Sequence, residues 1–145
     1  MLENENPILL VEDSPTMAKL AQQFMGPIGR EIIHTANVHD TIAVLEQRGE
    51  EIGTAILDGN IPLDEDDEQT TSATDGGSIK RVIETMRQLE LLRPSLVIVS
   101  FSLEPFSRYG ITSANVAPAR FIEWGKQRAH QIGQLIMQQS QPIRR

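Results

Sequence analysis

Short apolar runs alternate along this chain with segments whose apolar residues recur at helical spacing. Ile8–Val11, Thr54–Leu57 and residues 96–99 are continuous apolar stretches, typical of strands that are buried on both faces of a sheet. A strand, a helix and a further strand form a right-handed unit whose two strands run parallel. The pattern therefore predicts an α/β fold with a doubly wound parallel sheet that is covered by helices on both faces.

Five strands and four helices account for most of the expected regular structure. The strands are expected at residues 8–11, 31–35, 54–57, 96–99 and 120–124, and the helices at residues 15–25, 40–48, 78–92 and 127–139. Ser14 or Asp13 can cap the first helix, and Pro15 suits its first position. Ser78 can cap the third helix in the same way. This succession predicts a (βα)5 arrangement.

Two segments do not follow this alternation. Residues 63–77 include five consecutive acidic residues at positions 64–68 and are predicted to form a long mobile loop. An EF-hand calcium loop is excluded there, because Gln69 stands where such a loop needs glycine. Residues 103–118 contain interrupting prolines and a glycine, so no regular helix is expected between the fourth and fifth strands.

The composition excludes several classes of function. The chain of 145 residues is expected to form one domain, residues 1–145, with a core of about 7–139. It contains no cysteine, which excludes thiolate catalysis, and its net charge of −7 argues against a nucleic-acid-binding surface. The acidic N-terminus cannot be a signal peptide, and no apolar stretch approaches the ~20 residues that span a bilayer. A cytoplasmic protein without direct nucleic-acid or membrane contacts is expected.

Acidic residues follow two of the expected strands. Glu12 and Asp13 come directly after the first strand, and Asp58 comes directly after the third. Ligands bind beyond the carboxyl ends of parallel strands, where Ser100 and Lys126 from the last two strands would join these acids. Three neighbouring carboxylates cannot all stay ionised without help, and Mg²⁺ suits one or two carboxylates together with water and a phosphate. The cluster therefore indicates phosphoryl transfer onto or off a carboxylate.

Four short motifs occur in an informative order. They are Leu9-Leu10-Val11-Glu12-Asp13-Ser14, Leu57-Asp58-Gly59-Asn60-Ile61-Pro62, Asp75-Gly76 and Val99-Ser100. In this combination, over roughly residues 7–139, the chain resembles the receiver domain of two-component response regulators. The resemblance implies a CheY-like, flavodoxin-like fold, a three-layer sandwich built around a five-stranded parallel sheet.

The resemblance also implies a role for each residue of the acidic cluster. Asp58 would accept a phosphoryl group, in a reaction that requires Mg²⁺. Asp13, Asp58 and the backbone carbonyl of Asn60 would be direct metal ligands, and Glu12 would act on the metal through water. The physical chemistry agrees, because a carboxylate can act as a nucleophile and a metal ion with a lysine can neutralise the transferred charge.

The lysine segment departs from the family. Receiver domains have a lysine followed by proline after the fifth strand, but Trp124-Gly125 stands in that place and Lys126 comes two residues later. We expect Lys126 to be the functional lysine and to project towards Asp58, because side chains two apart on a strand share a face. A cis bond before Gln127 would cost about 2.5–4 kcal/mol, so a trans bond and a rearranged strand end are predicted. Ser100 would be the hydroxyl that moves to bond the phosphoryl group, and Ser102 could compete with it for that role.

The resemblance implies a stand-alone response regulator that catalyses its own aspartyl phosphorylation and dephosphorylation and is not a conventional enzyme. Its partners would be a histidine kinase or a histidine phosphotransfer protein and an unidentified downstream protein, with a homodimer as a further option. The alternative is a receiver-fold adaptor that binds a partner without phosphorylation, which the altered lysine segment and the interrupted fourth helix favour. A metal-dependent phosphatase of similar topology is disfavoured, because it needs an aspartate where Asn60 stands.

Overall fold

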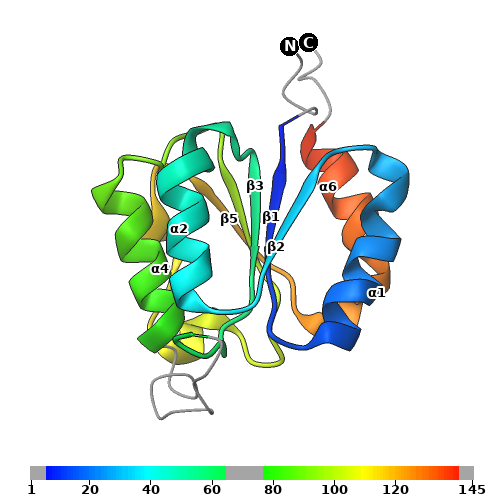
Figure 1. Cartoon of the computed structure of the whole chain (residues 1–145), viewed down its shortest axis with the longest axis horizontal. Coiled ribbons are helices and arrows are strands. Elements are labelled where there is room, and N and C mark those ends of the chain that lie inside the picture. The colour runs from blue at the N-terminus through cyan, green and yellow to red at the C-terminus, as the bar shows by residue number, and fades with distance from the viewer. Residues whose placement is uncertain (1–5, 65–76, 141–145) are drawn as a thin grey trace.

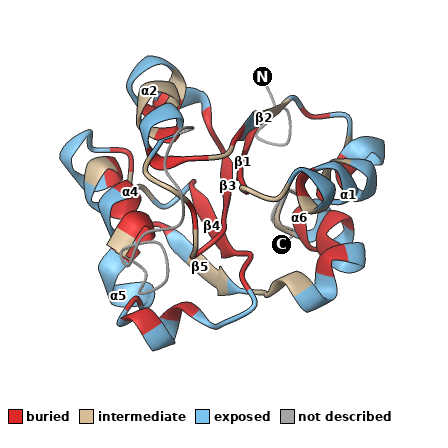
Figure 2. Ribbon diagram, turned by 60° about the horizontal axis from the view of Figure 1, so that its bottom comes forward, coloured by how far each residue is buried: buried red, intermediate tan, exposed pale blue. Residues whose placement is uncertain are grey.

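The computed structural model describes residues 6–64 and 77–140 and contains one five-stranded parallel sheet with strand order β2-β1-β3-β4-β5. The strands are β1 (Ile8–Val11), β2 (Ile32–Thr35), β3 (Thr54–Leu57), β4 (Val97–Ser100) and β5 (Arg120–Glu123). Every residue of the three central strands is buried, whereas the edge strands are partly exposed (Figure 2). The predicted doubly wound (βα)5 fold is confirmed.

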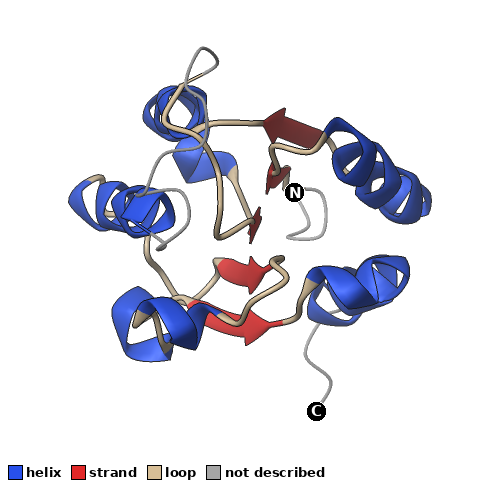
Figure 3. Cartoon of the chain, turned by 90° about the horizontal axis from the view of Figure 1, so that it is seen from below, coloured by secondary structure: helices blue, strands red, loops and turns tan. Residues whose placement is uncertain are grey.

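Helices cover both faces of the sheet, as Figures 1 and 3 show. The α-helices are α1 (Pro15–Met25), α2 (Val38–Arg48), α4 (Gly77–Gln88), α5 (Ser113–Val116) and α6 (Ile132–Ser140). Short 3₁₀ helices are η2 (Gly26–Ile28), η3 (Gly49–Glu51), η4 (Phe106–Tyr109) and η5 (Lys126–Gln131). Helices α1 and α6 pack on one face, and α2, α4 and α5 lie on the other. The result is the expected three-layer sandwich.

Alternation of side chains along the strands produces two apolar cores. On β1, Leu9 and Val11 belong to the core under α2 and α4, whereas Ile8 and Leu10 belong to the core under α1 and α6. Successive side chains of a strand point to opposite faces, so a continuous apolar run can supply both cores at once. This explains why the central strands have no polar alternation.

The start of α1 directs the chain away from the acidic edge of the sheet. The Ser14 hydroxyl accepts a hydrogen bond of 3.2 Å from the backbone N–H of Met17, and Pro15 occupies the first helical position. The capping role predicted for Ser14 is therefore confirmed, and Gly26 lies beyond the last residue of the helix, as expected. The cap fixes the turn in which Glu12 and Asp13 lie.

Several element boundaries differ by one to four residues from those predicted, and the larger differences concern the final helix. Ser78 lies inside the first turn of α4 and is not its cap, because the helix already includes Gly77. Strand β4 extends one residue beyond its apolar side chains, and Ser100 is therefore its last residue and does not follow it. Residues 126–131 form η5 with a break at Arg128, so the predicted long final helix becomes a 3₁₀ segment followed by α6.

The structure tests the prediction for residues 103–118 but not the one for the acidic loop. Between β4 and β5 the chain forms only η4 and the single turn of α5, which agrees with the absence of a regular helix predicted for residues 103–118. Most of the acidic loop, residues 65–76, lies outside the described residues, so the mobility predicted for it stays a prediction. No helix in the described part of the chain is both long and apolar enough to cross a membrane.

Candidate functional site at the carboxyl edge of the sheet

Three carboxylates meet at the carboxyl ends of β1 and β3. Val11 pairs with Leu57 in the parallel register, which places the residues that follow them, Glu12 and Asp58, side by side. One carboxylate oxygen from each of Glu12, Asp13 and Asp58 lies within 4.8 Å of the others. Glu12 is 0% exposed and Asp58 is 2% exposed, so the protein removes both groups from water. The predicted convergence of these three acids is confirmed.

Lys126 reaches this cluster from the other end of the chain. Its Nζ donates to Asp58 Oδ2 at 2.9 Å and lies 3.0 Å from Glu12 Oε1. Gly125, with a φ of 96°, turns the chain so that Lys126 begins η5. The Lys126–Gln127 peptide bond is trans, as predicted. The end of β5 is thus rearranged and the bond after Lys126 is trans. The Lys126 side chain nevertheless faces Asp58.

The charges in this cluster do not balance by themselves. Burial, and next the Glu12 carboxylate, raise the pKa of Asp58 to about 8, although Lys126 acts in the opposite direction. Burial also raises the pKa of Glu12 above its ordinary value. Burial alone would lower the pKa of Lys126, but attraction to Asp58 and Glu12 outweighs it and the pKa is raised. Two buried carboxylates opposite one ammonium group therefore retain a proton near neutral pH unless a cation binds.

Backbone groups hold both buried carboxylates in place. Glu12 Oε2 accepts a 3.0 Å hydrogen bond from the N–H of Ser14, and Asp58 Oδ1 accepts one of 3.1 Å from the N–H of Asn60. Each acid is thus fixed by the turn that follows its own strand. Such preorganisation matters for a reacting group, because the correct geometry exists before the reaction starts.

The donor set fits a hard divalent cation. All three side chains offer carboxylate oxygens, the ligand type that Mg²⁺ and Mn²⁺ prefer in proteins. Glu12 Oε1 is buried and accepts no hydrogen bond from the described residues, even though the Lys126 ammonium lies near it. Its neighbour is thus the Lys126 ammonium charge, and the oxygen ligands that the three acids offer are compatible with a divalent metal.

Ser100 and Tyr109 also lie at this edge of the sheet. The Ser100 hydroxyl is 1% exposed and accepts a 3.0 Å hydrogen bond from the backbone N–H of Trp124, so it is engaged with the end of β5. Tyr109 of η4 donates a long hydrogen bond of 3.3 Å to Asn60 Oδ1. The sequence gives no signal for Tyr109, because the segment that carries it lacks a regular pattern.

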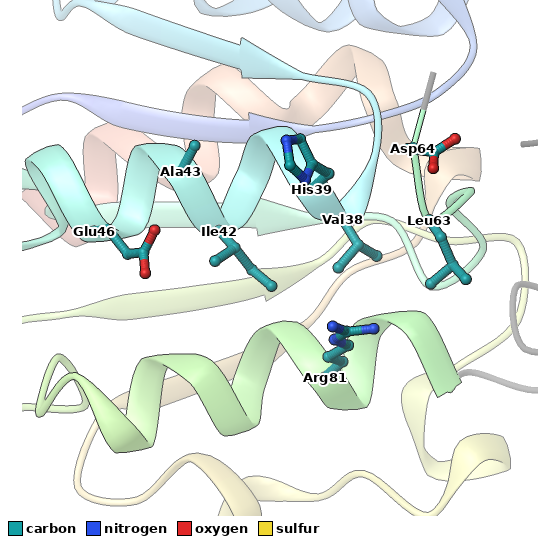
Figure 4. A pocket seen from close by; sticks show the side chains of 8 residues that line it. All are labelled: Val38, His39, Ile42, Ala43, Glu46, Leu63, Asp64 and Arg81. Carbon is teal, nitrogen blue, oxygen red and sulfur yellow. The ribbon is translucent and has the colours of Figure 1, made fainter. Parts of the chain in front are cut away.

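A cavity of about 410 Å³ lies apart from the acidic cluster, between α2 and α4 (Figure 4). Val38, Ile42 and Leu63 give it an apolar wall, and Arg81 points across it from α4. None of the clustered acids lines this cavity. The chemistry indicated by the acids therefore lies outside this cavity.

Comparison with solved structures gives a consistent fold. One match is the signal receiver domain of an HD domain-containing protein from Pseudomonas fluorescens Pf-5, with a TM-score of 0.66, 16% identity and coverage of 94% of each chain. Another is a CheY-like response regulator receiver domain protein from Methanospirillum hungatei JF-1, with a TM-score of 0.59 and 19% identity, covering 92% of this chain and 95% of that one.

A third match is the Mn²⁺-bound form of response regulator Rcp1, with a TM-score of 0.62 and 18% identity, covering 96% of this chain and 97% of that one. In comparisons by sequence, no protein-family model and no curated protein matches the chain. At these identities the likeness concerns the fold, and the chain has the fold of a response regulator receiver domain over nearly its whole length.

Proposed function

We propose that this protein is a response regulator receiver that accepts a phosphoryl group on Asp58. The observation that carries the proposal is the placement of a buried Asp58 between Glu12 and Lys126 at the carboxyl edge of a receiver-fold sheet. An aspartate that served only as a turn residue would not need a buried acid and a buried ammonium group beside it. Strongly perturbed carboxylates of this kind are typical of functional sites.

The proposed reaction transfers a phosphoryl group between a nitrogen and an oxygen atom. An oxygen of the Asp58 carboxylate attacks the phosphorus of a phosphohistidine on the donor protein. The new O–P bond forms as the N–P bond breaks, and the imidazole nitrogen leaves with the electron pair and takes up a proton. The buried ion pair holds the attacking carboxylate in place, and Lys126 remains beside the phosphoryl oxygens to balance their charge.

The proposed metal ion is Mg²⁺, held by Asp13, by Asp58 and by the backbone carbonyl of Asn60, with Glu12 acting through water. When bound, it supplies positive charge to the phosphoryl oxygens. The all-oxygen donor set of the three acids supports this assignment. The Lys126 ammonium group, which is paired with Glu12 and Asp58, would share the charge of these acids with the metal.

The proposed phosphodonor is a histidine kinase or a histidine phosphotransfer protein, and the proposed output is contact with a downstream protein. In this proposal the protein works in the cytoplasm and catalyses its own phosphorylation and dephosphorylation. A receiver-fold adaptor that binds its partner without phosphorylation is the second candidate. The single turn of α5 and the engagement of Ser100 by Trp124 favour it, since both depart from the arrangement expected for a switch.

Incubation with acetyl phosphate and Mg²⁺, followed by intact mass measurement, separates these two functions. The receiver proposal predicts the addition of one phosphoryl group, which hydroxylamine removes because an acyl phosphate is labile to it. Omission of Mg²⁺ should abolish the addition. A chain that stays unmodified under conditions in which it binds Mg²⁺ would support the adaptor.

A further inference from the structure

The tyrosine of η4 lies against the turn that follows Asp58. Tyr109 is buried, and its ring would lie 2.6 Å from a methyl group placed on Gly59. Its hydroxyl donates a 3.3 Å hydrogen bond to Asn60 Oδ1. The ring and the hydroxyl therefore contact two successive residues of this turn. The chain contains no other tyrosine, so a signal from this side chain can be assigned without ambiguity.

A single residue, Asn60, links the Tyr109 phenol to the Asp58 carboxylate. The backbone N–H of Asn60 donates to Asp58 Oδ1 at 3.1 Å, and the Asn60 side chain accepts from the Tyr109 hydroxyl. Asn60 thus holds the carboxylate on one side and is held by the phenol on the other. Hydrogen bonds in such a chain support one another, so loss of the phenol hydroxyl is expected to loosen the carboxylate.

The short helix η4 gives Tyr109 a fixed base. Phe106, the first residue of η4, is fully buried and stacks on Phe121 of β5 with the ring centroids 6.0 Å apart. At the other end, Gly110 has a φ of 77°, and the N–H of Ile111 donates to the carbonyl of Phe106 at 3.0 Å. A residue that supports a reacting group must itself be held by packing and hydrogen bonds, and Tyr109 meets this requirement.

Core packing accounts for the Tyr109 ring but not for its hydroxyl. The ring belongs to the apolar core under α2 and α4, and a phenylalanine would fill the same space. A buried hydroxyl is costly unless it is paired, so the polar atom adds a requirement that the core itself does not make. Its partner is Asn60, the residue whose backbone carbonyl is the proposed metal ligand. The hydroxyl is therefore directed at the acidic edge.

We propose that Tyr109 is a positioning residue, which holds the turn of Asp58 and Asn60 in the geometry that binds the metal ion and receives the phosphoryl group. This inference rests on the proposed phosphorylation of Asp58 and assigns a further residue to the same site. Tyr109 acts through Asn60 and transfers no proton. The irregular segment between β4 and β5, which carries η4, thereby gains a part in the function of the site.

An absorption spectrum tests the hydrogen bond without metal or phosphodonor. The second-derivative tyrosine band reports on Tyr109 alone, since the chain has one tyrosine. Asn60→Ala keeps the backbone N–H and carbonyl of residue 60 and removes the acceptor of the phenol, so it should shift this band. Gln88→Ala, at an exposed position of α4, is the control and should leave the band unchanged. An identical band in Asn60→Ala and the unmodified chain would overturn the inference.

A double-mutant cycle tests the role of the bond at the site. Tyr109→Phe keeps the ring and removes the hydroxyl, so it should weaken Mg²⁺ affinity and slow labelling by acetyl phosphate, each by about fivefold, while far-UV circular dichroism stays unchanged. In an Asn60→Ala background the same change should have no further effect, because the bond is already lost. Ser107→Ala, at an exposed position of η4, should behave as the unmodified chain does.

The cycle separates positioning from a general structural role. A defect that acts through core packing would add to the effect of Asn60→Ala, so equal losses in both backgrounds would overturn the inference. Mg²⁺ affinity and labelling of Tyr109→Phe that equal those of the unmodified chain would overturn it as well. An unmodified chain that neither binds Mg²⁺ nor takes up a phosphoryl group would instead overturn the proposed function, and this inference with it.

Discussion

Lys126 Nζ lies 2.9 Å from Asp58 Oδ2, although 68 positions separate the two residues in the chain. The parallel sheet makes this contact, because it brings the ends of β3 and β5 to one edge with β4 between them. The Lys126 side chain is 13% exposed and the Asp58 side chain is 2% exposed, so the pair is largely shielded from water. Attraction between charges is stronger there than at a surface.

Replacing the lysine should separate metal binding from phosphorylation. Lys126→Ala leaves the carboxylates of Asp58 and Glu12 without their ammonium partner, so we expect Mg²⁺ to bind at least as well as in the unmodified chain. Labelling by acetyl phosphate should fall, because no cation remains beside the phosphoryl oxygens. Isothermal titration with Mg²⁺ and intact mass measure the two effects, and Lys80→Ala on the exposed surface of α4 is the control. Loss of Mg²⁺ binding in Lys126→Ala would mean that the lysine organises the cluster.

The raised pKa of Asp58 predicts how stability depends on pH in the absence of metal. Its pKa rises from 3.8 to about 8 on folding, so the folded state binds the proton more tightly than the unfolded state does. The resulting stabilisation is fully present below pH 3.8 and is lost as the pH rises towards 8. Glu12 shifts in the same direction, which strengthens the effect.

Urea unfolding at a series of pH values, in buffer with a chelator, measures this dependence. The free energy of unfolding should decrease between about pH 5 and pH 8, and Asp58→Asn should flatten the decrease. Added Mg²⁺ should restore stability at the higher pH, since it binds the ionised carboxylates and releases protons. A profile that rises over the same interval would show that the carboxylates are ionised without any metal.

Metal binding should depend on the strand ends and not on the acidic run. Asp13→Ala is expected to weaken Mg²⁺ affinity by about tenfold or more, because one direct carboxylate ligand is removed. Neutralising residues 64–68 should change the affinity much less, since none of them is a proposed ligand of the metal. The measurement is Mg²⁺ titration of both variants at a single ionic strength. The opposite ranking would place the metal in the acidic segment.

Gly59 should tolerate no side chain, because the Tyr109 ring lies against it. A methyl group at this position would lie 2.6 Å from the Tyr109 ring, so either the ring or the turn after Asp58 must move. We expect Gly59→Ala to cost about 1–3 kcal/mol of unfolding free energy and to weaken Mg²⁺ binding. Gly26→Ala is the matched control, because a methyl group there meets no atom within 4 Å. Equal stability of the two variants would show that Tyr109 does not constrain the turn.

The strands that carry the acids could be predicted closely from the sequence. Ile8–Val11 and Thr54–Leu57 are buried on both faces, so every residue in them is apolar or otherwise suited to burial, and each ends where an acid begins. If the two strands are parallel neighbours, this pattern also predicts that Glu12 and Asp58 lie side by side. The roles of these residues as metal ligands and phosphoacceptor remain predictions.

The backbone that positions Lys126 differs from the predicted one. Continued strand alternation predicted that Lys126 would share a face with Trp124, but β5 ends at Glu123 and η5 begins at Lys126. A positive φ at Gly125 and a backbone bond to Ser102 determine the position instead. Such contacts between distant segments leave no periodic signal, which is also why Tyr109 was missed.

The identity of the phosphoacceptor is tested most directly by two matched substitutions of aspartate. Asp58→Asn and Asp64→Asn remove the same charge, one from the buried cluster and the other from the exposed residue at the start of the acidic run. Each variant is incubated with acetyl phosphate and Mg²⁺ and measured by intact mass. The account predicts that Asp64→Asn gains one phosphoryl group as the unmodified chain does, and that Asp58→Asn gains none. Stoichiometric labelling of Asp58→Asn would contradict it.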